Sequence, residues 1–128
     1  DAGAHLTFLC DAGFGLHVLG HWARDKGIMP LEKAVYKLTL EPAKLFGIKD
    51  RGFIDKGAWA DLLLFDPRTV NRGPSYRLHD LPSGASRLTT PSIGVHGVWV
   101  NGRKVADEGG LIPKAPLSGQ VIREYDSF

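Results

Sequence analysis

Lys56-Gly57-Ala58-Trp59-Ala60-Asp61-Leu62-Leu63-Leu64-Phe65-Asp66-Pro67 is the stretch from which the fold can be inferred. Its uninterrupted apolar run, 62–65, is short and is bounded by Pro67, which lacks the backbone N–H that a strand ladder uses. Such a run favours a strand that is buried on both faces. We therefore expect other elements to cover this strand.

The sequence after this strand predicts a hairpin. The β-favouring residues 95–100 lead into Asn101-Gly102, and 103–106 lead out of it. An Asn-Gly pair suits a tight hairpin turn because both turn positions need positive φ. The intervening segment, about 67–94, is rich in Pro and Gly and shows no sustained period, which predicts a long loop. In the tail after Pro113, residues 120–123 are a candidate for one terminal strand.

The sequence before the strand predicts three helices. Apolar residues recur at helical spacing over 16–23, and Gly27 is the expected stop. A second helix is expected over 30–38, with Pro30 as its first residue. A third is expected from Pro42 to Gly47, with the following isoleucine folding back as the hydrophobic contact of the helix end.

Composition bounds the class of protein. The chain has 128 residues, 43% hydrophobic and 23% charged, which suits one folded unit or a piece of a larger one and excludes a disordered chain. The net charge is +2 and the basic residues are scattered, so nucleic acids and anionic membranes are poor partners. The longest apolar run, 62–65, is too short for a membrane helix.

Three side chains are candidates for local chemistry. His17 and His21 lie four residues apart, which places both imidazoles on one helix face where a metal can bind. The residue after His17 is Val18 instead of the Glu of a metalloprotease helix, and no third ligand is nearby, so a surface or supporting role is favoured. Cys10 has no local activating base and is expected to be a small buried hydrophobe. As the only cysteine it forms no internal disulfide, which favours a reducing, cytoplasmic location.

The order of several motifs along nearly the whole chain resembles the C-terminal part of the amidohydrolase superfamily, most closely the N-acyl-D-amino-acid deacylases, or D-aminoacylases. The Gly-x-x-Ala-Asp pattern that precedes apolar residues and Asp-Pro is shared by many amidohydrolases. Two further motifs, Asp1-Ala2-Gly3-Ala4-His5 and Asp50-Arg51-Gly52, narrow the resemblance to the deacylases. The motifs are Asp1-Ala2-Gly3-Ala4-His5, Leu31-Glu32-Lys33-Ala34-Val35 with Leu38-Thr39 and Pro42-Ala43, Asp50-Arg51-Gly52, 56–67, and Gly94-Val95 with Val98-Trp99-Val100-Asn101-Gly102.

This resemblance implies a full-length (β/α)₈ barrel with one or two divalent metals, usually zinc, beside a small β-sandwich. The chain is then an α+β fragment of that enzyme. Residues 1–50 are expected to form the end of the barrel, with the strand-8 aspartate loop and the following helices. Residues 51–128 are expected to form part of the composite β-sandwich domain, with the long loop at about 67–94.

The resemblance also implies a site. Asp1 matches the family's aspartate at the end of the last barrel strand, where barrel active sites are built. In the family this carboxylate touches the metal, takes a proton from the metal-bound water and passes it to the departing nitrogen. His5 is a candidate for contact with the small N-acyl-D-amino-acid substrate. The family's other metal ligands precede this aspartate, so the isolated chain is expected to hold no zinc and to be inactive.

Two alternatives remain open. Cyclic-amide hydrolases such as hydantoinases belong to the same superfamily, although Ala2-Gly3-Ala4 argues against them. The chain is alternatively a non-catalytic β-rich module that binds a partner. Exposed strand edges and apolar faces around 62–65 would also allow a homo-oligomer to form through the sandwich or the barrel-facing surface.

Overall fold

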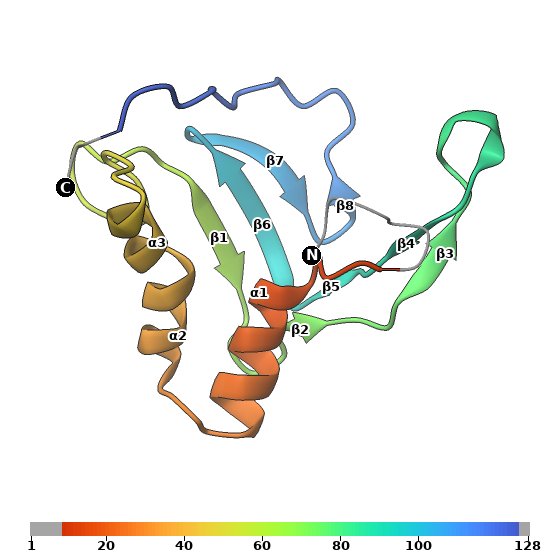
Figure 1. Cartoon of the computed structure of the whole chain (residues 1–128), viewed down its shortest axis with the longest axis horizontal. Helices are drawn as coiled ribbons and strands as arrows, with labels where there is room; N and C mark the ends of the chain where they lie inside the picture. The colour runs from red at the N-terminus through yellow and green to blue at the C-terminus, as the bar shows by residue number, and fades with distance from the viewer. Residues whose placement is uncertain (1–8, 126–128) are drawn as a thin grey trace.

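The computed structural model describes residues 9–125, in which a helical part precedes a set of antiparallel strands (Figure 1). The mixed α+β composition is as predicted. The helical part comprises α1 (Phe14–His17), η1 (Val18–Asp25), α2 (Leu31–Leu38) and α3 (Leu40–Leu45). η1 continues α1 with π-type hydrogen bonding, since the Lys26 N–H donates to the His21 carbonyl five residues back (2.9 Å).

The predicted helix ends are confirmed, and two starts are corrected. Gly27 and Gly47 have φ of 60° and 64°, the left-handed conformation that ends a helix. The Ile48 N–H donates to the Ala43 carbonyl (2.8 Å) and closes α3. α3 begins at Leu40, earlier than predicted, because a proline in the first helical turn needs no N–H donor. Pro30 is the residue before α2 instead of its first member, because its ψ of 154° is extended.

The main sheet has the order β1-β6-β7-β8, and each neighbouring pair is antiparallel. The predicted strand and hairpin are both confirmed. The hairpin turn has φ of 49° at Asn101 and 77° at Gly102, as a tight turn requires. The strands are β1 (Leu62–Phe65), β6 (Val95–Val100), β7 (Arg103–Asp107) and β8 (Gly110–Leu111).

The prediction that β1 is buried on both faces is wrong for the chain as described. Leu62, Leu63 and Leu64 are 37%, 43% and 54% exposed. β1 pairs with β6 along one edge, but residues 9–125 supply too few side chains to cover its faces. An apolar strand left this open is a surface that another segment or molecule would cover.

The segment predicted as a loop at about 67–94 is instead a two-stranded ladder that projects from the molecule (Figure 1). Each of these short strands is stabilised by pairing with a strand that lies about ten or more residues away in the sequence, so the strands form without a sustained local period. The predicted strand at 120–123 is absent, and this part of the tail has no ladder partner. The elements are β2 (Asn71–Arg72) paired with β5 (Ser92–Ile93), β3 (Tyr76–Leu78) paired with β4 (Arg87–Thr89), and a 3₁₀ turn, Pro82–Gly84.

The helices and the strands meet at Val70, which is fully buried against Leu19, Ala23 and Ala34. A Cβ on Gly20 would lie 2.2 Å from the Val70 carbonyl oxygen, so only glycine allows η1 to approach the chain this closely. That carbonyl also accepts a hydrogen bond from Arg24 Nη1 (2.8 Å). This contact holds the helical part against the start of the ladder.

Asp61, in the motif that precedes β1, ties three segments together. Its carboxylate accepts the Asn101 N–H (2.8 Å) at the hairpin turn and pairs with the Arg51 guanidinium. Arg51 also lies over the Trp59 ring, 5.0 Å from its centroid. The next residue, Gly52, has φ of 85° and packs against the α2–α3 junction, where no side chain would fit. The motif residues therefore have a structural role in this region.

We expect Asp61→Ala to lower the free energy of unfolding by about 1–3 kcal/mol, because the Asn101 amide and the Arg51 guanidinium lose their shared acceptor. Asp61→Asn keeps one acceptor oxygen but loses the charge and the second acceptor, so its effect should be smaller than that of Asp61→Ala. Urea unfolding followed by tryptophan fluorescence measures both variants. Equal midpoints for Asp61→Ala and the unaltered chain would contradict this role.

Candidate functional site

The two site residues predicted by resemblance, Asp1 and His5, lie outside the described residues. The segment that follows them, 9–13, leads directly into α1, where the Phe14 N–H donates to the Asp11 carbonyl (2.9 Å). Gly13 in this segment packs against the ladder, since a Cβ there would lie 2.8 Å from Arg72 Cβ and 3.3 Å from Thr90 Cγ2. The ladder and the segment after the predicted catalytic loop are therefore in contact.

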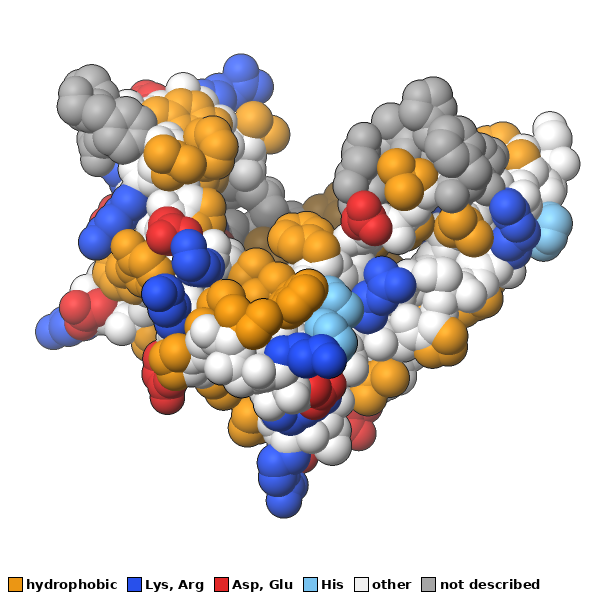
Figure 2. Space-filling view, turned by 60° about the horizontal axis from the view of Figure 1, so that its bottom comes forward, with side chains coloured by type: hydrophobic (Ala, Val, Ile, Leu, Met, Phe, Trp, Pro, Cys, Tyr) orange, Lys and Arg blue, Asp and Glu red, His pale blue; other side chains and the backbone are white. Residues whose placement is uncertain are grey.

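The structure brings His17 and His21 together. Their rings stack with centroids 4.6 Å apart and planes 14° apart, and the Trp22 ring meets both edge-on. Figure 2 shows histidine side chains bordered by hydrophobic and basic ones on this face. Within residues 9–125, no third histidine, cysteine or carboxylate joins them in a group able to hold a metal.

Partial burial and nearby positive charges favour the neutral form of His17. Partial burial lowers the pKa of His17 from its ordinary value, and the nearby charges of His21 and Arg72 lower it further.

Cys10 is only half-buried, so the prediction of a buried hydrophobe is corrected. It lies in the segment before α1, whose residues range from exposed Leu9 to buried Gly13. No base activates the thiol through a hydrogen bond in the described part of the structure.

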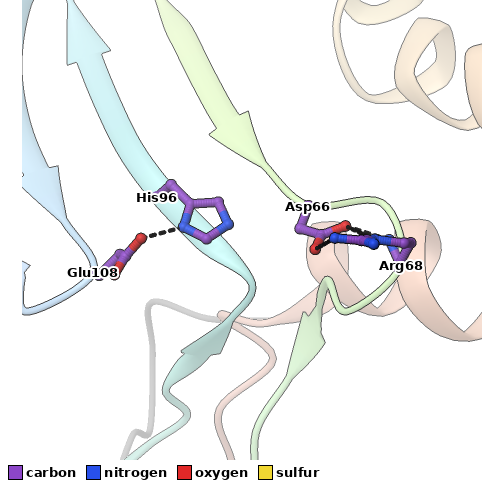
Figure 3. Close-up of polar contacts among 4 residues, drawn as sticks. All are labelled: Asp66, Arg68, His96 and Glu108. Atoms are coloured by element: carbon purple, nitrogen blue, oxygen red, sulfur yellow. Dashed lines mark hydrogen bonds and ion pairs between the residues drawn. The ribbon is translucent and has the colours of Figure 1, made fainter.

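Two ion pairs lie near the end of β1, and both have a structural role (Figure 3). Asp66 accepts hydrogen bonds from the Arg68 backbone (2.8 Å) and from two guanidinium nitrogens (3.1 and 3.0 Å), and these bonds lower the pKa of the Asp66 carboxyl. His96 on β6 pairs with Glu108 in the turn before β8. In each pair the acidic and the basic side chain bind each other, so neither pair is arranged to activate a nucleophile.

A groove of about 430 Å³ lies between α2 and β1. Its walls are almost entirely apolar, with Asp61 as the one ionisable lining residue. Without a paired acid and base it has no catalytic chemistry of its own. Its apolar walls favour cover by an apolar segment. The lining residues are Leu19, Val35, Leu38, Thr39, Gly52, Phe53, Ile54, Asp61, Leu62, Leu63 and Phe65.

Residues 7–106 match the family model described as amidohydrolase family. This chain belongs to the amidohydrolase family. It is 42% identical over 91 residues to the D-aminoacylase of Alcaligenes xylosoxydans xylosoxydans, covering 71% of this chain and 17% of that enzyme. The chain therefore spans a minor part of the relative's length.

Two solved structures are similar to this amidohydrolase chain. A D-aminoacylase variant in complex with copper chloride is 35% identical, with a TM-score of 0.66 over 88% of this chain and 21% of that one. The N-acyl-D-glutamate deacylase of Bordetella bronchiseptica, complexed with zinc and a phosphonate inhibitor, is 37% identical, with a TM-score of 0.61 over 84% and 20%. None of the described helices in this family member is long and apolar enough to cross a membrane.

Sequence reasoning missed the polar residues of the ladder, because their segment was predicted to be a loop. The alternation of polar and apolar residues in 76–78 and 87–89 was the available signal, but each run is too short to predict a strand by itself. Only the pairing seen in the structure brings these side chains together on one ladder, whose base packs on Gly13 through Arg72 and Thr90.

We expect Arg72→Gln to raise the pKa of His17 toward its ordinary value, because one of the nearby positive charges is removed. Because the pKa of His17 is lower in the folded chain than in the unfolded chain, protonation of His17 favours unfolding. The folded chain therefore has its full stability above the unfolded pKa, and this stability is lost as pH falls through the folded pKa. NMR titration of the imidazole protons measures the shift, and Arg103→Gln, on β7, is the matched control. An unchanged His17 pKa in Arg72→Gln would contradict the assigned cause.

Proposed function

We propose that this chain is the C-terminal portion of a metal-dependent amidohydrolase that hydrolyses the amide bond of N-acyl-D-amino acids. The observation that carries the proposal is the similarity of most of the chain, at 35–42% identity, to a D-aminoacylase, to a D-aminoacylase variant in complex with copper chloride and to an N-acyl-D-glutamate deacylase. Identity of this order across both the helical part and the strands supports a shared reaction as well as a shared fold.

In this proposal residues 1–50 form the end of a (β/α)₈ barrel and 51–128 form part of a β-sandwich. Asp1 is the catalytic carboxylate and a metal ligand, and His5 contacts the substrate. Zinc, as one or two ions, would require further ligands, because residues 9–125 contain no group of three potential ligands. The chain alone is then inactive, and a cytoplasmic location remains our prediction.

The open apolar groove along β1 supports the same proposal. Exposed leucines on β1 and a groove beside α2 are expected where a larger enzyme continues. The same exposure also favours the second candidate, a non-catalytic module that pairs with a partner or a second copy. The two candidates differ in whether the chain supports hydrolysis once the rest of an enzyme is supplied.

The test joins residues 1–128 to the preceding part of the Alcaligenes D-aminoacylase in place of its matching segment. With zinc supplied, we expect hydrolysis of N-acetyl-D-amino acids, and a loss of about 100-fold or more in kcat with Asp1→Asn, because a proton-transfer group is removed. Asp25→Asn, an exposed carboxylate on η1, is the matched control and should retain activity.

A folded, zinc-loaded joined protein that hydrolyses no N-acetyl-D-amino acid would contradict the proposal. Hydrolysis of hydantoins instead would favour a cyclic-amide hydrolase. A stable, metal-free oligomer of the chain with no gain of activity in the joined protein would favour the interaction module.

A further inference from the structure

The C-terminal tail, residues 113–125, crosses the end of the main sheet and reaches the loop between α3 and β1 (Figure 1). The tail and this loop border a pocket of about 360 Å³, hereafter the tail pocket, which has the size of a small-molecule site. The tail lies beyond residue 106, where the match to the family model ends, so the family match does not account for this pocket. The lining residues are Lys49, Arg51, Trp59, Gln120, Val121, Ile122, Arg123 and Glu124.

One chain of hydrogen bonds fixes both walls of the tail pocket. The side-chain amide of Asn101, in the hairpin turn, donates to the Ser118 carbonyl and anchors the tail. The Asn101 backbone N–H donates to Asp61 (2.8 Å), and the second carboxylate oxygen of Asp61 pairs with Arg51 in the loop. The hairpin turn therefore holds the tail and the loop in fixed positions on either side of the pocket.

Arg51 is a positioned cation with donors to spare. Its side chain is only 15% exposed, and its guanidinium lies over the Trp59 ring, 5.0 Å from the centroid. Asp61 binds Nη1, and among residues 9–125 no acceptor binds Nε or Nη2. Most of the five N–H donors of this largely buried group therefore lack a protein acceptor. An oxyanion in the pocket would supply one, with the strength of a charge-assisted hydrogen bond.

The rest of the lining indicates the kind of anion. Arg123 adds a second guanidinium, and within residues 9–125 it makes no hydrogen bond or ion pair. Glu124 is the one carboxylate in the lining, and it limits the positive charge to what a monoanion needs. Trp59 and Val121 are 44% and 78% exposed, so the same pocket also offers a flat ring and an aliphatic side chain.

We infer that the tail pocket binds a small organic monoanion with a flat, apolar body, of the class of aromatic carboxylates. The Arg51 and Arg123 guanidinium groups donate to the carboxylate, and the body of the ligand packs against Trp59 and Val121. The inference goes beyond the proposed function and does not depend on hydrolysis, because every lining residue lies in the described part of the chain.

Benzoate, benzamide and acetate separate the two parts of this ligand. Benzamide keeps the ring without the charge, and acetate keeps the charge without the ring. Each is titrated into the full chain, residues 1–128, at constant ionic strength. NMR follows the indole N–H signal of Trp59, which is assigned by its loss in Trp59→Phe. We expect benzoate to bind with a Kd of about 1 mM, and benzamide and acetate to bind at least about tenfold more weakly.

Arg123→Gln removes one guanidinium from the tail and should weaken benzoate binding about tenfold. Arg68→Gln is the matched control, because Arg68 is 86% exposed and follows the end of β1 that is remote from the hairpin turn. Backbone amide spectra that superimpose outside the substituted region verify that both variants are folded. Equal affinities for benzoate and benzamide, or for the two arginine variants, would overturn the inference. A Trp59 signal that benzoate does not shift far above the expected Kd would overturn it as well.

Discussion

The close approach of η1 to Val70 is the contact on which the rest of the arrangement depends. Gly20 has no side chain, so the helix backbone lies against the Val70 carbonyl, and Arg24 donates to the same oxygen. Among residues 9–125, Val70 is the one large side chain that is completely buried. Because Arg72 follows two residues later and packs on Gly13, the same contact fixes the base of the ladder against the segment before α1.

The rest of the chain is held by few buried groups. In the described part of the chain, three of the five buried hydrophobic residues are alanines, whereas the leucines of β1 remain on the surface. The accessible surface is 9094 Å², against about 6,700 Å² for an ordinary folded protein of this mass. A chain that covers a minor part of its relatives' length and leaves this much apolar surface open fits an element of a larger enzyme.

Local rules predicted the parts of the fold that depend on neighbouring residues. Asn101-Gly102 predicted the hairpin because the turn needs positive φ at both positions, and Gly47 predicted the end of α3 for the same reason. The exposure of β1 was not predictable, because burial depends on what other segments supply. The pairing of β3 with β4 was missed because Tyr76 gains its strand conformation from Thr89, far along the sequence.

The most direct test of this account compares Gly20→Ala with Gly15→Ala in the same helical segment. Alanine favours a helix over glycine by about 1 kcal/mol, and a Cβ on Gly15 meets only Leu38 Cδ1 at 4.0 Å, so Gly15→Ala should leave stability unchanged or raise it. Gly20→Ala should lower the urea midpoint despite the same gain in helix propensity, because its Cβ would lie 2.2 Å from the Val70 carbonyl oxygen. A Gly20→Ala midpoint equal to or above that of Gly15→Ala would contradict the account.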